Sequence, residues 1–83
     1  MRYQVEFKPR AVRDLDSLPQ HTVERIIEKL GMMSDNLVGD VKRLTNFTPE
    51  YRLRVGEYRV LFELVGNRIV VYHVRHRKEA YER

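Results

Sequence analysis

Two glycine-containing turns divide the C-terminal half of this chain into three strand-like segments, and this pattern restricts the fold more than any other sequence feature. Each turn is two residues long, which is the length that joins antiparallel strands in a hairpin. Alternation in the first segment and β-branched residues in the third favour strands. The sequence therefore predicts a three-stranded antiparallel meander. Its strands are residues 51–55, 58–65 and 68–75, joined by Gly56-Glu57 and Gly66-Asn67.

The N-terminal half predicts one more strand and two helices. Residues 2–7 alternate apolar and polar side chains, which is typical of a half-buried strand. Pro9 opens the first helix, and Pro19 ends it and starts a second helix that continues through about residue 34. Residues 35–50 show no clean period and are expected to form a connecting loop.

The predicted order is β-α-α-β-β-β, which is an α+β fold in a single domain over residues 1–83. The sheet should be mainly antiparallel, with the two-helix hairpin on one face and the other face open to solvent. Successive strand residues point to opposite faces. Arg52 and Arg54 must therefore lie on the open face if Leu53 points at the helices.

Positive charge is concentrated in the same half of the chain as the meander. The 83 residues include 16 Lys and Arg against 12 Asp and Glu, a net charge of +4. Residues 1–41 have a net charge of −1, whereas residues 42–83 have 10 basic and 5 acidic side chains, a net charge of +5. Most of this excess is arginine, which suits bidentate contact with phosphate. The asymmetry indicates a polyanionic partner, with a basic solvated surface that binds nothing as the alternative.

Several classes of site are excluded or disfavoured by the residues present. The chain has no cysteine, so a thiolate nucleophile and a Cys-based zinc site are excluded. The three histidines lack metal-ligand spacing and no glycine-rich phosphate loop is present, so we expect no metal and no other cofactor. No segment is apolar enough to span a membrane, and the first ten residues contain no apolar signal region. A cytoplasmic location is therefore expected.

A cluster of arginine, tyrosine and histidine is the candidate site. Guanidinium groups stabilise the extra charge of a pentavalent phosphorane, and positive charge favours a tyrosine phenolate that can act as general base. RNA supplies its own nucleophile, the 2′-hydroxyl, so such a site needs no metal. His73 shares the parity of Ile69 and Val71, so we expect it to pack half-buried rather than to act in catalysis. The cluster comprises Arg52, Arg54, Arg59, Arg75, His76, Arg77 and Tyr81.

Two stretches of the chain resemble the RelE/ParE toxin superfamily. Residues 51–62, YRLRVGEYRVLF, are similar to its core signature, and residues 74–81, VRHRKEAY, to its closing motif. The resemblance implies a toxin of a type II toxin–antitoxin system, bound by a RelB-like antitoxin in a toxin–antitoxin hetero-oligomer. Members of the RelE branch are mRNA interferases that enter the ribosome and cleave mRNA in the A site by 2′-hydroxyl attack. The resemblance therefore implies an endoribonuclease that inhibits translation.

The resemblance also implies roles for individual residues. Arg59 matches the arginine that contacts the scissile phosphate, and Tyr81 matches the tyrosine proposed as general base. Arg75 and Arg77 both fit the general acid, Arg75 by its six-residue spacing to Tyr81 and Arg77 by its local motif. His76 is the rival general base, because its ordinary pKa suits neutral pH. The expected RNA-binding residues are Lys42, Arg43, Arg52, Arg54, His76 and Lys78.

Two other functions stay open at this point. One is a toxin directed against DNA gyrase, as in the ParE branch, which lacks the nuclease residues. The other is a nucleic-acid-binding module whose basic face does no chemistry. Tyr81 together with Arg59 and either Arg75 or Arg77 favours the nuclease, because binding alone needs positive charge but no positioned tyrosine.

Overall fold

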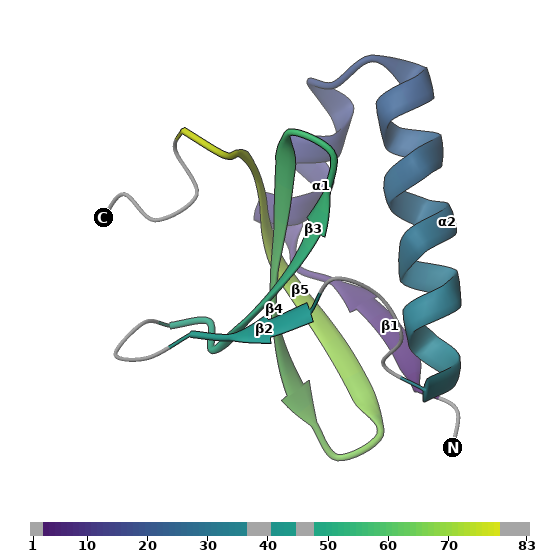
Figure 1. Ribbon diagram of the computed structural model, residues 1–83, viewed down its shortest axis with the longest axis vertical. Coiled ribbons are helices and arrows are strands. Elements are labelled where there is room, and N and C mark those ends of the chain that lie inside the picture. The colour runs from purple at the N-terminus through teal and green to yellow at the C-terminus, as the bar shows by residue number, and fades with distance from the viewer. Residues whose placement is uncertain (1–2, 37–40, 45–47, 79–83) are drawn as a thin grey trace.

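The computed structural model describes residues 3–36, 41–44 and 48–78, which form two helices and one five-stranded sheet (Figure 1). The elements are β1 (Gln4–Phe7), α1 (Pro9–Asp16), α2 (Gln20–Asn36), β2 (Val41–Arg43), β3 (Tyr51–Val55), β4 (Tyr58–Val65) and β5 (Arg68–His76). The strand order is β1-β5-β4-β3-β2, with β1 parallel to β5 and every other pair antiparallel. The predicted α+β class and mainly antiparallel sheet are confirmed. Neither helix of this described part is long and apolar enough to cross a bilayer.

Glycine makes both predicted hairpin turns possible. Gly56 and Gly66 have φ angles of 59° and 60°, in the left-handed region that a Cβ atom disfavours. In each hairpin the residues that flank the turn are direct register partners, so each loop contains two residues. The predicted meander of β3, β4 and β5 is confirmed.

One apolar core lies between the sheet and both helices. Its buried members are Ala11, Ile26, Leu30, Met33, Leu53, Val55, Val60, Phe62, Ile69, Val71 and Val74. The three α2 members recur at helical spacing, α1 contributes Ala11, and the strand members mostly alternate along each strand. Leu53 and Val55 belong to this core, so Arg52 and Arg54 lie on the face away from the helices, as the alternation predicts.

The prediction of a loop over residues 35–50 is wrong in two places. Helix α2 continues to Asn36, and residues 41–43 form β2, which pairs with β3 and sets Lys42 opposite Arg52. A strand of three residues is too short to show a period in the sequence. It is favoured because it pairs the outer backbone edge of β3 and packs Val41 against the core.

Strand β5 contains a β-bulge that changes which face its side chains occupy. Phe62 is opposite Val71, but Leu61 is opposite His73, so Tyr72 is an extra residue with no partner position on β4. Side chains after the bulge therefore have the opposite parity to those before it.

Helix α1 lies along the edge of β5 where β1 ends. The last pair of the β1–β5 ladder is Phe7 with Val71, and the N–H of Lys8 donates to the Val71 carbonyl at 2.9 Å. Beyond this point a carboxylate of α1 replaces the missing strand, because Asp14 Oδ2 accepts the backbone N–H of Val74 at 3.0 Å. The bulged part of β5 is thereby held against α1.

The last described residues of the chain form the end of a strand and a turn. Strand β5 continues through His76, and Arg77 and Lys78 then form a turn. The N–H of Arg77 donates to the Glu57 carbonyl at 2.7 Å, which ties this turn to the β3–β4 hairpin. Residues 79–83 lie outside the described residues.

Candidate functional site

Three arginines lie directly opposite one another on three adjacent strands. Arg54 of β3 is the register partner of Arg59 in β4, and Arg59 is the partner of Arg75 in β5. Adjacent strands are about 4.8 Å apart, so the three backbones span roughly 10 Å. Their neighbours Val55 and Val60 point into the core, so the arginines lie on the face away from the helices.

A second row of side chains lies beside the first on the same face. It runs across four strands through Lys42, Arg52, Leu61 and His73. Leu61 is 1% exposed although it is not part of the core between sheet and helices. Like charges at directly opposite positions destabilise a sheet, so packing does not explain this arrangement. We call the five cations of the two rows the basic face: Lys42, Arg52, Arg54, Arg59 and Arg75.

Arg59 is held in place by the β3–β4 turn. Its Nη1 donates to the carbonyl of Gly56 at 3.3 Å and to that of Tyr58 at 3.2 Å, and the residue is half-buried. A guanidinium has five N–H donors in a rigid fork. Both of these bonds use Nη1, and no hydrogen bond of Nε or Nη2 to another described residue is seen.

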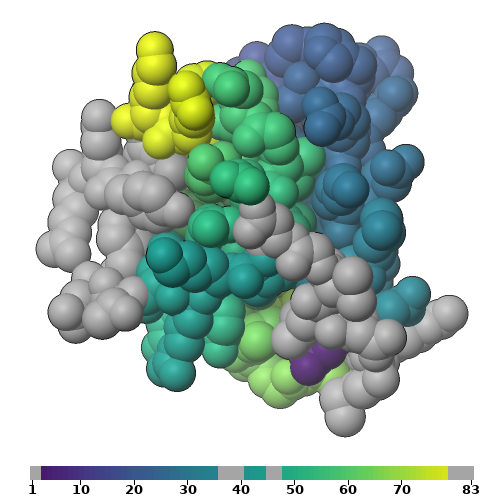
Figure 2. All heavy atoms as spheres, in the orientation of Figure 1, coloured from purple at the N-terminus to yellow at the C-terminus, as the bar shows by residue number. Residues whose placement is uncertain are grey.

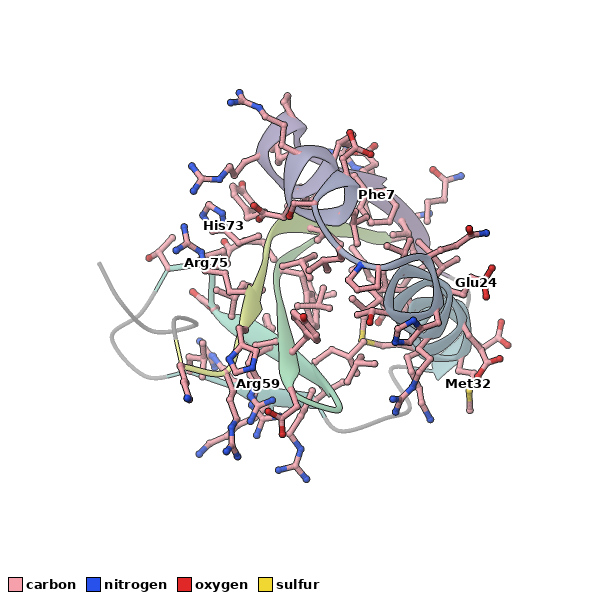
Figure 3. All side chains as sticks on the ribbon, turned by 90° about the horizontal axis from the view of Figure 1, so that it is seen from above. Phe7, Glu24, Met32, Arg59, His73 and Arg75 are labelled. Atoms are coloured by element: carbon pink, nitrogen blue, oxygen red, sulfur yellow. The ribbon has the colours of Figure 1, made fainter. Side chains whose placement is uncertain are left out.

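His73 lies on this face because of the bulge at Tyr72, and Figure 3 shows it beside Arg75. Its Nδ1 atom is buried and has no hydrogen-bond partner. Burial lowers the pKa of His73 below its ordinary value of 6.5, and the positive charges of Arg75 and Arg10 lower it further against the opposing effect of Asp14. The imidazole is therefore neutral near pH 7.

The sequence parity that grouped His73 with Ile69 and Val71 is wrong. Those two residues point into the core, whereas His73 lies opposite Leu61 on the other face. One signal in the sequence marks the change: the core residues of β5 switch from odd to even positions between Val71 and Val74. A regular strand cannot point both Val71 and Val74 into the same core.

The carboxylate of Glu57, in the β3–β4 turn, contacts side chains near the end of the described chain. Its Oε2 lies 3.4 Å from His76 Nε2 and 3.7 Å from Arg77 Nε. His76 Nδ1 accepts the backbone N–H of Lys78 at 3.3 Å, and the His76 ring packs edge-on against Tyr58 with centroids 5.5 Å apart. Figure 2 shows this segment, in yellow, against the green hairpin. His76 thus lies on the helix side of the sheet with both ring nitrogens engaged.

A hollow of about 340 Å³ opens between α1 and the last part of β5. Its walls include Arg75 and His76, so it borders the basic face. On its α1 side the Nε of Arg10 and Oδ1 of Asp14 form an ion pair at 3.5 Å. The hollow therefore has Arg75 and His76 on its β5 side and the Arg10–Asp14 ion pair on its α1 side.

The remaining predicted residues lie apart from the two rows. Arg43 alternates with Lys42 and so faces the other way, and its Nη2 pairs with Glu50 Oε2 at 3.3 Å. Lys78 is exposed in the turn. Tyr81 lies outside the described residues. Within residues 3–36, 41–44 and 48–78, no group of three or more His, Asp or Glu side chains is placed to hold a metal ion.

Comparison with known sequences extends over nearly the whole chain. Residues 5–81 match the family described as ParE toxin of type II toxin-antitoxin system, parDE. Toxin RelE3 of Methanocaldococcus jannaschii is 35% identical over an alignment 83 positions long, and the alignment covers 94% of this chain and 94% of that protein.

Solved structures share the fold over a similar extent. A chain in the RelB-RelE antitoxin-toxin complex from Methanococcus jannaschii is 32% identical, covers 93% of this chain and 95% of its own length, and superposes with a TM-score of 0.76. A chain in the archaeal RelE-RelB complex from Pyrococcus horikoshii OT3 is 27% identical, with 96% and 100% covered and a TM-score of 0.78.

Proposed function

The chain belongs to the RelE/ParE family of toxins from type II toxin–antitoxin systems, and we propose that it is a ribosome-dependent endoribonuclease. The toxin enters the ribosomal A site and cleaves the mRNA there, which stops translation. The 2′-hydroxyl attacks the adjacent phosphorus, a cyclic phosphate forms, and the 5′-oxygen of the next nucleotide leaves. The reaction needs no metal ion.

The row of Arg54, Arg59 and Arg75 is the observation that supports this proposal best. The pentavalent phosphorane carries more negative charge than the phosphodiester, and cations fixed in advance stabilise it without reorganising. Arg59 lies in the middle of the row and is oriented by the Gly56 and Tyr58 carbonyls. It therefore takes the role of phosphate contact in the transition state.

Arg75 stabilises the leaving 5′-oxygen in this proposal. Its backbone is directly opposite Arg59, about one strand spacing away, so both guanidiniums can reach one phosphate. Arg77 is a weaker candidate for this role, because its Nε and its backbone N–H are both engaged with Glu57. Arg52, Arg54 and Lys42 bind the flanking phosphates.

Tyr81 takes the proton of the 2′-hydroxyl. It follows Lys78 by three residues, and three residues of chain reach at most about 10 Å. The turn that precedes it is bonded to Glu57, next to the Gly56 carbonyl that accepts from Arg59. His76 is a weaker candidate for the base, because Glu57 and the N–H of Lys78 engage its two ring nitrogens.

A RelB-like antitoxin is the proposed protein partner, in a toxin–antitoxin hetero-oligomer. The two solved relatives are complexes of RelE with RelB. Acidic residues of such a partner would neutralise the basic face and block entry into the ribosome. Ribosomal RNA and mRNA are the partners of the free toxin, which places its action in the cytoplasm.

The experiment that tests this function adds the purified toxin to ribosomes programmed with a defined mRNA, in the presence of enough EDTA to remove trace divalent transition metals while Mg²⁺ keeps the ribosomes intact. We expect one cut within the A-site codon, and none when the antitoxin is added first. Intact mRNA with the toxin bound to the ribosome would contradict the proposal.

A second candidate function is inhibition of DNA gyrase, because the matching family is described by its ParE members. The two functions separate in one comparison, since a gyrase poison leaves programmed mRNA intact and stabilises cleaved plasmid DNA in the presence of gyrase. The nuclease cuts the programmed mRNA and does not cause cleaved plasmid DNA to accumulate with gyrase. The row Arg54, Arg59 and Arg75 favours the nuclease, because a protein–protein contact does not need three arginines in register.

A further inference from the structure

His73 is placed among the groups that would hold the RNA. It lies two residues before Arg75 on the same face, which corresponds to about 7 Å along the strand. It is also diagonal to Arg59, since Arg59 and Leu61 are two apart on β4 and Leu61 is its direct partner. Diagonal positions are about 7–8 Å apart, within reach of long side chains.

The two ring nitrogens of His73 have different surroundings. Nδ1 is buried without a partner, whereas Nε2 is not among the buried unpartnered atoms of the described residues, and no hydrogen bond to it is seen there. A buried N–H without an acceptor is rarer and costlier than an unused acceptor lone pair. The neutral ring therefore carries its proton on Nε2 and presents an N–H donor to the basic face.

From this geometry we propose that His73 is a further RNA-contacting residue, whose Nε2–H donates to an oxygen of the ribose–phosphate backbone next to the cleaved bond. The inference rests on the proposed RNA cleavage for the identity of its ligand. As a donor, His73 does not compete with Tyr81 for the role of general base. Asp14 supports it as a positioning residue, because its bond to the Val74 N–H holds the bulged part of β5 against α1.

A pair of substitutions separates contact from packing. His73→Gln keeps an N–H donor near the position of Nε2, whereas His73→Asn keeps one only near Nδ1. Two quantities are measured for each: the single-turnover cleavage rate on programmed ribosomes, and the affinity for a short RNA made uncleavable by a 2′-deoxy sugar at the cut. His21→Gln, at an exposed histidine of α2, is the matched control, and thermal unfolding checks the fold of all variants.

Loss of one hydrogen bond corresponds to a change of about tenfold. The proposal predicts about tenfold weaker RNA affinity and slower cleavage for His73→Asn, and values within about threefold of wild type for His73→Gln and His21→Gln. Equal losses in both His73 variants, no loss in either, or a larger loss for Gln would overturn the contact.

The affinity measurement separates this proposal from the proposed function. One outcome is that wild-type protein binds the uncleavable RNA but cuts no mRNA, while His73→Asn and His73→Gln differ in RNA affinity as expected. That outcome would support the His73 contact and overturn the nuclease. Wild-type protein that cuts mRNA while both His73 variants match it in affinity and rate would support the nuclease and overturn the contact.

Discussion

Arg59 and Arg75 lie directly opposite each other in the β4–β5 ladder although both carry a positive charge. Arg54 extends the same row on the other side of Arg59, and neither of the two rows on this face contains an acidic residue. Like charges in such positions repel each other, which by itself costs stability. An anion placed between the guanidiniums relieves that repulsion, and phosphate groups of RNA are the anions that the proposed function supplies.

Removal of Arg59 should slow cleavage strongly without unfolding the protein. Arg59→Ala deletes the central guanidinium, and loss of one charge-stabilising donor typically lowers a rate by about 10²–10³. Stability should change by less than about 1 kcal/mol, because the loss of two hydrogen bonds to turn carbonyls is offset by relief of repulsion. Single-turnover cleavage and urea unfolding measure the two effects.

The matched control for this substitution is Arg68→Ala. Arg68 is an exposed arginine of β5 that pairs with Glu6 at 3.1 Å, outside the two rows. An exposed pair of this kind contributes about 0–1 kcal/mol, so its loss should leave both stability and cleavage near wild type. Equal loss of cleavage in both variants would count against a specific role for Arg59.

Ribosome binding should lose part of its salt dependence when the basic face is neutralised. Each phosphate contact contributes about 0.7–0.9 to the slope of log affinity against log salt concentration. Arg52→Ala with Arg54→Ala should therefore flatten the slope by roughly 1.4–1.8 in a binding titration over several salt concentrations. Arg13→Ala with Arg68→Ala removes the same charge elsewhere and should leave the slope nearly unchanged, whereas similar slopes for both double variants would contradict the assignment of this face.

Protein stability should fall as the pH drops below about 6.5, in part through His73. Its folded-state pKa is lowered by burial and by Arg75 and Arg10 against the opposing effect of Asp14, so the unfolded chain binds the proton more tightly. The contribution of this group to the free energy of unfolding is therefore fully present above pH 6.5. It decreases as the pH falls from 6.5 to the lowered pKa. Urea unfolding from about pH 5.5 to 7.5 should show a shallower decline for His73→Gln than for His21→Gln. Parallel curves for the two variants would show that His73 does not titrate as its surroundings indicate.

The cleavage rates of one Tyr81 variant and one His76 variant show which of the two residues acts as the general base. Tyr81→Phe deletes only the hydroxyl and should lower the single-turnover rate by roughly 10²–10⁴, with ribosome affinity unchanged. His76→Ala should have a smaller effect, because Glu57 and the Lys78 N–H engage the two nitrogens of the ring. A Tyr81→Phe protein that cleaves at nearly the wild-type rate, beside an inactive His76→Ala protein, would assign the step to the histidine.

The local parts of this fold were predictable from the sequence. Both hairpins depend on glycine turns. The alternation in β3 correctly placed Arg52 and Arg54 on the other face of the sheet from Leu53 and Val55. These features depend on neighbours in the chain, so a short stretch of sequence contains them.

The non-local parts were not predictable in the same way. Strand β2 exists because β3 offers it an edge, and the bulge at Tyr72 exists because β5 must follow β4 and then pass along α1. Both are decided by pairing partners distant in sequence, and the bulge reversed the expected position of His73. The β3–β4 turn fixes Arg54 opposite Arg59. The turn at Gly66 alone would set Arg59 opposite Val74, so the bulge at Tyr72 is also needed to bring Arg75 opposite Arg59.

Attack by the 2′-hydroxyl on the adjacent phosphorus determines which products the cleavage leaves. Ribosomes are programmed with two mRNAs that differ in one atom, the 2′-oxygen of the nucleotide on the 5′ side of the cut. We expect the ribose mRNA to be cut to a fragment that ends in a 2′,3′-cyclic phosphate, seen by mass spectrometry, and the 2′-deoxy mRNA to stay intact. Cleavage of the deoxy mRNA at the same position, or a 5′-phosphate on the downstream fragment, would rule out attack by the 2′-hydroxyl.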